Sequence, residues 1–126
     1  MTKKPHPIPP ADAEAAKLHP YAKIRLIKEK PFYGPGAHQL LVLTEETGSL
    51  RHACSKMGLS YSKGRSIVAL IEEQTGHPVI VSQQGGKTGG YSLVTDEARK
   101  LMQSYSEFAA EANQCLGDLF LKHFPQ

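Results

Sequence analysis

Apolar residues recur every three or four positions through the middle of the chain, a spacing that is typical of helices with one buried face. This spacing predicts helices over 36–46 and 50–57, and a third that begins at Ser60 or Tyr61 and ends near Gln74. The positions expected to face the core are Ala37, Leu40, Leu41, Leu43, Leu50, Ala53, Cys54, Met57, Gly64, Ile67, Val68 and Ile71.

Glycine and serine mark the predicted helix boundaries. Gly48 and Gly76 follow the first and third helices, where a left-handed residue commonly ends a helix. Ser49 is placed to cap the second helix. Gly58 is placed for a tight left-handed turn between the second and third helices. The two helices around Gly58 are therefore expected to form a helix-turn-helix.

Alternation of apolar and polar residues predicts strands on either side of these helices. Residues 22–28 alternate in this way, so we expect a strand with one buried and one basic face. Residues 30–36 contain two prolines and two glycines and are expected to form a loop. Segments 79–81 and 91–94 are expected to pair around a glycine-rich tip at 83–90. We expect the strand over 22–28 to close the same small sheet.

A long amphipathic helix is predicted from residue 96 to about residue 122, with Thr95 as its cap. Its apolar residues alternate at spacings of three and four, close to the repeat of a coiled coil. Such a helix extends roughly 40 Å at 1.5 Å per residue, which is more than one small core covers. We therefore expect its distal half to pair with a second subunit. The apolar seam begins at Ala98 and continues through the expected dimer-interface residues Leu101, Tyr105, Phe108, Ala112, Cys115 and Leu119.

A helix-turn-helix followed by a hairpin is a winged helix. The predicted fold class is α/β, mainly α: a winged helix-turn-helix with a small antiparallel sheet and a long C-terminal dimerisation helix. Residues 1–20 are expected to be a flexible arm, in which 11–19 favours a short helix. The DNA-binding domain is expected over 21–95 and the dimerisation helix over 96–126.

Composition places the chain among ordinary soluble globular proteins. It has 126 residues, 40% hydrophobic and 21% charged, which fits one domain with a modest core. The N-terminus has no apolar stretch of the kind found in secretory signals, and no run is long enough to span a bilayer. The two cysteines have no short metal-type spacing. We expect a cytoplasmic protein without a membrane partner.

Positive charge is concentrated where the motif lies. The net charge is +3 overall. Residues 1–35 have seven basic and three acidic residues, and residues 49–91 have five basic and two acidic ones. Residues 92–126 have three basic and five acidic residues. This distribution suits a polyanion on one side of the fold, although an ordinary solvated face would also account for it.

The third helix is the candidate DNA recognition element. Short hydroxyl side chains let a helix enter a major groove about 12 Å wide, while lysine and arginine reach phosphates or guanine edges. The alternative is a solvated polar face. With Arg51 on the second helix, the candidate DNA-binding residues are Ser60, Tyr61, Ser62, Lys63, Arg65 and Ser66.

The glycine-rich tip at 83–90 adds Lys87 and Thr88 to the candidate DNA-binding residues. Its Gly-Lys-Thr sequence matches the end of a phosphate-binding P-loop, but Val81 stands where that motif needs glycine, and a strand follows instead of a helix. A wing beside a DNA groove fits better. A hairpin loop without any ligand is the alternative.

Other chemistry has little support in the sequence. The six histidines are scattered without metal-type spacing, so no metal site is expected. No nucleophile–base arrangement or pair of catalytic carboxylates stands out, and we expect neither enzymatic activity nor a cofactor.

Several of these motifs together resemble the N-terminal winged-helix domain of ModE-type molybdate-responsive regulators, which is related to the LysR-like helix-turn-helix. The resemblance covers roughly residues 22–120. It is carried by Gly34-Pro35-Gly36, Glu46-Thr47-Gly48-Ser49, Met57-Gly58-Leu59-Ser60-Tyr61, the glycine-rich wing and Leu93-Val94-Thr95. The segment Lys63-Gly64-Arg65 and the wing residue Thr88 depart from the usual family pattern.

The resemblance implies DNA binding by the helix that begins near Ser60 and a wing at 83–90. It also implies dimerisation through helices outside the helix-turn-helix and the wing. In the full-length regulators the oxyanion sits in a separate C-terminal domain, so a stand-alone form is expected here, and binding of molybdate is not. The expected function is that of a homodimeric, sequence-specific regulator that binds double-stranded DNA. The alternatives are a winged helix that binds protein and a small DNA-binding sensor for an oxyanion.

Overall fold

The computed structural model describes residues 16–83 and 91–125. These residues group into two compact units. One is Lys23–Ala109, and the other comprises the described parts of residues 1–22 and 110–126. Most of the predicted arm over 1–20 lies outside the described residues. Residues 16–20 form neither helix nor strand, so the described end of the segment 11–19 is not helical.

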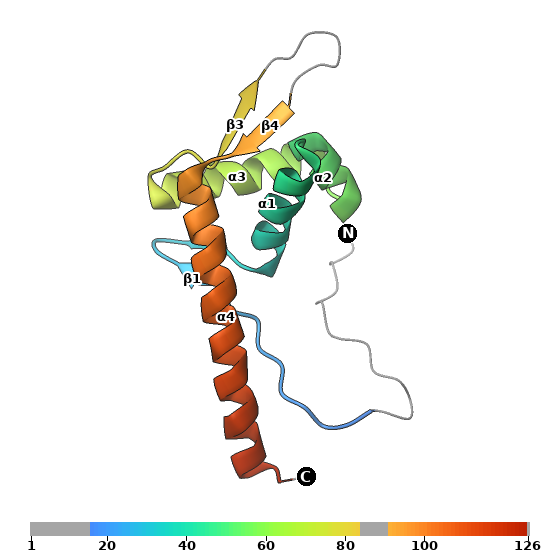
Figure 1. Cartoon of the computed structure of the whole chain (residues 1–126), viewed down its shortest axis with the longest axis vertical. Helices are drawn as coiled ribbons and strands as arrows, with labels where there is room; N and C mark the ends of the chain where they lie inside the picture. Colours follow the sequence, from blue (N-terminus) through green and yellow to red (C-terminus); the bar gives the residue numbers. More distant parts are fainter. Residues whose placement is uncertain (1–15, 84–90, 126) are drawn as a thin grey trace. The chain divides into compact units, whose positions relative to one another are not determined.

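Three helices form the centre of the larger unit (Figure 1). They are α1 (Pro35–Thr47), α2 (Leu50–Met57) and α3 (Tyr61–Thr75), each within a residue or so of its predicted bounds. Gly58 ends α2 with a φ of +70°, and its N–H is donated to the carbonyls of the last turn. Ser60 then caps α3. The short turn between these two caps brings α3 directly against α2.

The core lies where the predicted apolar stripes meet. Leu40 and Leu41 of α1, Ala53 and Cys54 of α2, and Ile71 of α3 are almost fully buried. These five positions confirm the helical stripes that the spacing predicts. The core is completed by Tyr33, Leu50, Val68, Val79, Val94, Ala98, Met102 and Tyr105.

The strands form two separate antiparallel pairs, which corrects the predicted sheet. β1 (Leu26–Ile27) pairs with β2 (Pro31–Tyr33), and β3 (Ile80–Gln83) pairs with β4 (Tyr91–Val94). The predicted strand over 22–28 is therefore only two residues long and does not join the hairpin. The predicted loop over 30–36 contains a strand.

Gln74 gives a physical reason for the β1–β2 pair. Its side chain is buried in α3, and its Oε1 accepts hydrogen bonds from the backbone N–H groups of Glu29 (2.8 Å) and Lys30 (3.2 Å). These bonds satisfy the turn between the two strands, so the chain reverses there instead of continuing to the hairpin. Tyr33, which follows, is then buried in the core.

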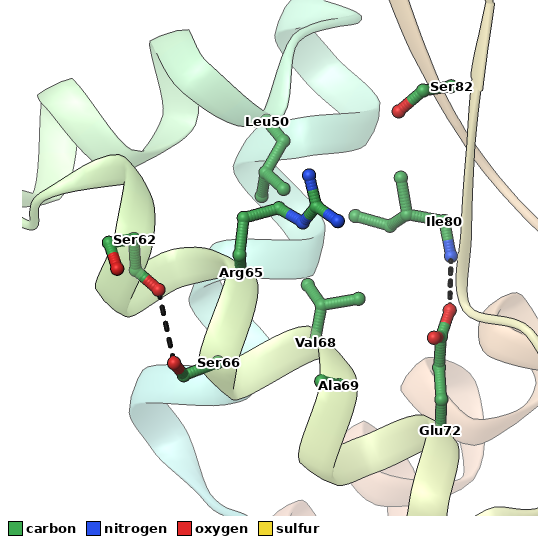
Figure 2. Close-up of a pocket in the computed structure, with 9 residues that line it drawn as sticks. All are labelled: Leu50, Ser62, Arg65, Ser66, Val68, Ala69, Glu72, Ile80 and Ser82. Atoms are coloured by element: carbon green, nitrogen blue, oxygen red, sulfur yellow. Dashed lines mark hydrogen bonds between the residues drawn. The ribbon is translucent and has the colours of Figure 1, made fainter.

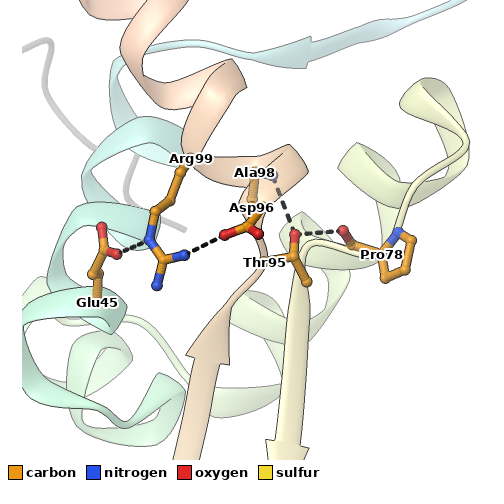
Figure 3. A network of polar contacts seen from close by, with 6 residues as sticks. All are labelled: Glu45, Pro78, Thr95, Asp96, Ala98 and Arg99. Carbon is orange, nitrogen blue, oxygen red and sulfur yellow. Dashed lines mark hydrogen bonds and ion pairs between the residues drawn. The ribbon is translucent and has the colours of Figure 1, made fainter.

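The fourth helix, α4 (Asp96–His123), begins where the sequence predicts it. Thr95 Oγ1 accepts the Ala98 N–H at 3.1 Å and donates to the Pro78 carbonyl at 2.8 Å (Figure 3). Arg99 pairs with Glu45 at the end of α1 and with Asp96. Because these three charged side chains are largely exposed, their pairing orients the start of α4 more than it stabilises it.

The first part of the predicted seam on α4 is used by the chain's own core, which corrects the expected role of Tyr105. Tyr105 is only 6% exposed, its hydroxyl donates to the Ile24 carbonyl at 2.8 Å, and its ring meets Tyr33 edge-on at 5.0 Å. Leu101 also packs partly against this core. An aromatic ring with these contacts is not free to form a subunit interface.

Further along α4 the apolar residues are more accessible. Phe108 is 55% exposed and Leu119 is 53% exposed. Cys115 is exposed and Ala112 is half-buried. A dimer interface over these four residues stays a prediction.

No helix in the described part of the chain is both long and apolar enough to cross a bilayer.

Candidate nucleic-acid interface

Helix α3 presents one polar face to solvent. Ser62, Lys63, Arg65 and Ser66 are all exposed, as the helical spacing predicts. The opposite face is buried, and it includes Gly64 at the crossing with α2. A methyl group added at Gly64 would lie less than 3.0 Å from Cys54 Sγ, closer than real methyl contacts come. The absence of a side chain at Gly64 therefore sets how closely the two helices approach.

The hydroxyl groups on α3 are partly engaged by the helix itself. Ser60 Oγ accepts the Lys63 N–H at 3.0 Å, so Ser60 acts as the helix cap. Ser66 Oγ donates to the Ser62 carbonyl at 3.1 Å. The Lys63 ammonium has no hydrogen-bond or ion-pair partner among the described residues. Lys63 is thus the side chain of this face that is most available to a ligand.

The Tyr61 ring contacts the guanidinium groups of two arginines from different helices. The guanidinium carbon of Arg51, on α2, lies 4.0 Å from the centre of the Tyr61 ring. The guanidinium carbon of Arg65, on α3, lies 5.7 Å from the same centre, and its Nη1 donates to the Tyr61 hydroxyl at 3.3 Å. Cation–π contact with one ring thus holds two positive charges near the start of α3.

A groove of about 490 Å³ runs between α3 and the β3–β4 hairpin (Figure 2). Leu50, Val68 and Ile80 give it an apolar floor, and the Arg65 side chain points into it. Its one carboxylate, Glu72, is committed to the fold, because it accepts the Val79 N–H at 2.8 Å. The remaining lining residues are Ser62, Ser66, Ala69 and Ser82.

A second groove of about 270 Å³ lies beside the first turn of α2 and the hairpin. Arg51 and Tyr61 line it, together with Gln83 and Tyr91, whose side chains meet at 3.4 Å. Sequence reasoning did not single out Gln83 or Tyr91. Their pairing across the two strands is the signal that could have found them, because residues opposite each other in a hairpin share a face.

Ser92 fixes strand β4 to the corner between α1 and α2. Its N–H donates to the Gly48 carbonyl at 2.8 Å, and its Oγ accepts the Leu50 N–H at 3.2 Å. Ser92 is itself 9% exposed. One backbone and one side-chain hydrogen bond of Ser92 therefore hold the hairpin against this corner. Sequence reasoning missed this contact as well.

The outer face of the hairpin is apolar. Val81 and Leu93 are opposite each other in the β3–β4 register and are 42% and 45% exposed. Tyr91 is on the same face and is 46% exposed. A wing used only for phosphate contact does not need such a surface.

Two of the predicted DNA-binding residues, Lys87 and Thr88, lie outside the described residues.

Burial raises the pKa of the Cys54 thiol, although the Arg51 guanidinium acts in the opposite direction. Such a thiol is a core residue and a poor nucleophile. Within residues 16–83 and 91–125, no group of three or more His, Cys, Asp or Glu side chains is arranged to hold a metal ion.

Helices α2 and α3, with the hairpin fixed beside them, define a winged helix-turn-helix, in a mainly helical chain with a long C-terminal helix. No protein-family profile matches the sequence. Over 71 residues the chain is 32% identical to the molybdenum-pterin-binding protein MopB of Rhodobacter capsulatus. This similarity is distant and partial, since the matched stretch covers 56% of this chain and only 26% of MopB.

Proposed function

We propose that the protein is a homodimeric regulator of transcription that binds double-stranded DNA in a sequence-specific way and has no enzymatic activity. The observation that carries this proposal is the exposed polar face of α3, with the unpaired Lys63 ammonium and the two arginines gathered on Tyr61 beside it. Unpaired positive charge on a helix that follows a tight turn suits a polyanion with a groove.

The proposed arrangement places α3 in the major groove. Lysine and arginine side chains recognise guanine edges there, and serine hydroxyls accept or donate to several bases. The wing over 83–90 would lie at the adjacent backbone or minor groove. In a dimer, two copies of α3 would contact half-sites separated by roughly 34 Å, one turn of the duplex, or a multiple of it.

Dimerisation through α4 is part of the same proposal. Phe108 and Leu119 present large apolar side chains to solvent, and an interface would remove them from water. We expect size-exclusion chromatography with light scattering to give twice the mass of one chain. Replacing both residues with Glu should give a monomer that has lost affinity for a palindromic site. A monomeric wild-type chain would reject this part of the proposal.

Selection of binding sites from random duplexes tests the DNA-binding function. We expect a palindromic site to be enriched, and its affinity to fall as salt rises, because bound phosphates release counterions. Lys63→Gln should weaken binding to the enriched site. Lys56→Gln is the matched control, because Lys56 is an exposed lysine on α2 and is not part of the polar face of α3. Affinity that does not change with salt would reject the proposal.

The exposed face of the hairpin favours a second candidate, a winged helix that binds another protein. Val81, Tyr91 and Leu93 would be the contact residues. This candidate predicts that no DNA site is enriched and that a partner is captured by the wild-type chain but not by Val81→Asp. Enrichment of a palindrome, together with unchanged DNA binding by Val81→Asp, would favour the regulator.

The partial similarity to MopB is the reason to keep a third candidate, a DNA-binding sensor for an oxyanion. MopB is named for a molybdenum pterin, and the family that this sequence resembles responds to molybdate. Calorimetry with molybdate and with tungstate tests it directly. Absence of heat, with unchanged DNA affinity in either salt, would reject this candidate and leave the regulator without an oxyanion signal.

A further inference from the structure

Tyr61 is the first residue of α3, and its ring contacts Arg51 of α2 as well as Arg65 of α3. We propose that Tyr61 is a positioning residue, which holds Arg51 and Arg65 as one paired site for the phosphates of a DNA strand. Base recognition then falls to Lys63, which does not line the groove that Arg65 enters. This inference rests on the proposed function, because it assigns phosphate contact and base contact to different residues of the DNA-binding surface.

The charge environment of the two arginines supports a ligand with negative charge. Arg99 provides the contrast within the same unit, since its guanidinium is paired with Glu45 and Asp96. Neither Arg51 nor Arg65 has a carboxylate partner in the described part of the chain. Their positive charges repel each other, and the electron-rich face of the Tyr61 ring offsets part of this repulsion. Both guanidinium groups therefore keep N–H donors for an anion.

The direction of Arg65 favours phosphate over a base edge. Its side chain turns from α3 toward Leu50 and Ile80, into the groove beside the hairpin (Figure 2). A base-reading side chain would instead extend from the face that enters the major groove. The Tyr61 hydroxyl holds Arg65 in this turned position through the bond at 3.3 Å.

The position of Arg51 on α2 also favours contact with phosphate. Arg51 is on α2, the first helix of the helix-turn-helix, and in this motif the first helix crosses the DNA backbone while the second lies in the groove. The contact with Tyr61 thus joins a backbone-side residue of α2 to the start of the recognition helix. A DNA strand that passes along this junction would contact both guanidinium groups.

The measurement is the affinity of the full chain for its selected duplex and for a scrambled duplex, over a range of salt concentrations. Arg51→Gln and Arg65→Gln should each weaken binding to both duplexes by the same factor, on the order of tenfold, and reduce the salt slope by about one. The ratio of the two affinities should stay constant. Lys63→Gln, the matched charge-removing control, should lower that ratio.

Tyr61 variants test the positioning role. Tyr61→Leu keeps an apolar side chain but removes both contacts, so binding should weaken by about as much as in the arginine variants. Tyr61→Phe keeps the ring under Arg51 and loses only the hydroxyl bond to Arg65, so its loss should be smaller. In the Arg51→Gln/Arg65→Gln background, Tyr61→Leu should have no further effect. Circular dichroism confirms that each variant is folded.

The outcomes separate this inference from the proposed function. If the wild-type chain binds no duplex, the proposed function fails, and this inference fails with it. If the wild-type chain binds but Arg65→Gln changes the sequence preference at an unchanged salt slope, Arg65 reads bases and only this inference is overturned. Additive losses from Tyr61→Leu and the arginine double variant would overturn the positioning role alone.

Discussion

The close approach of α2 and α3 at Gly64 makes a quantitative prediction for Gly64→Ala. The new methyl group would lie less than 3.0 Å from Cys54 Sγ, and Cys54 is 1% exposed, so the thiol cannot turn into solvent. Overpacking of a core costs about 1–3 kcal/mol. Alanine gains up to about 1 kcal/mol over glycine in a helix, which offsets part of this cost. We expect Gly64→Ala to lower the free energy of unfolding by about 1–2 kcal/mol.

A double variant tests the physical cause. Removing the sulfur with Cys54→Ala leaves the new methyl group with contacts of 3.8 Å to the Cβ of residue 54 and 3.9 Å to Leu40 Cδ2, which are ordinary distances. Gly64→Ala/Cys54→Ala should therefore be more stable than Gly64→Ala alone. The expected coupling between the two sites is at least about 1 kcal/mol.

Urea denaturation followed by circular dichroism measures these differences, with Gly117→Ala as the control. Gly117 is also within a helix, but a methyl group there would meet nothing within 4 Å. That control should be neutral or slightly stabilised. The reasoning is refuted if Gly64→Ala is as stable as Gly117→Ala, or if the double variant is no more stable than Gly64→Ala.

Three further predictions concern the packing around α1, α3 and α4. Tyr105→Phe removes the donor to the Ile24 carbonyl and should lower the free energy of unfolding by about 1–2 kcal/mol, whereas Tyr21→Phe, at an exposed tyrosine, should change it little in the same urea titration. Gln74→Leu leaves the N–H groups of Glu29 and Lys30 without their acceptor and should cost about 1–3 kcal/mol, with faster amide hydrogen exchange at both residues; unchanged exchange would contradict the role of Gln74. Burial lowers the pKa of His38, whose Nδ1 lies 2.7 Å from the Tyr33 hydroxyl. Because the unfolded state then binds the proton more readily, stability should be constant above about pH 6.5 and fall as the pH drops from there toward the lowered pKa; His38→Gln should flatten this fall and His77→Gln should not.

The helices were predictable because their signals are local. Ser49 and Ser60 accept N–H groups three residues ahead, and Gly58 adopts a left-handed conformation that other residues rarely take. Each of these features acts within a few residues of the boundary that it sets. The exposed residues of α3 follow from the same periodicity, so this part of the candidate site was also predictable.

The rest depended on contacts between residues distant in the sequence. The β1–β2 pair is held by Gln74, whose hydrogen bonds span 44 and 45 residues, and Tyr105 reaches Ile24 across 81 residues. No periodicity encodes such partners. The short strands and the core role of Tyr105 were missed for this reason.

The grouping of Arg51, Tyr61 and Arg65 shows the same limit at the candidate site. All three residues were predicted to contact DNA, but their contacts with one another depend on the angle at which α3 leaves the turn after Gly58. That angle is fixed by packing at Gly64 and Cys54, which the sequence pattern identifies only as buried. Whether these residues contact DNA stays a prediction.

The anchoring of the hairpin through Ser92 has a consequence for how relatives of this domain can diverge. The bonds from Ser92 to Gly48 and Leu50 fix the position of strand β4, and they use backbone groups of the α1–α2 corner. The segment between Gln83 and Tyr91 can therefore change in length and sequence while these bonds hold β4 in place. Tip exchange between homologues should therefore yield folded chimaeras, and under the proposed function their affinity for DNA should change.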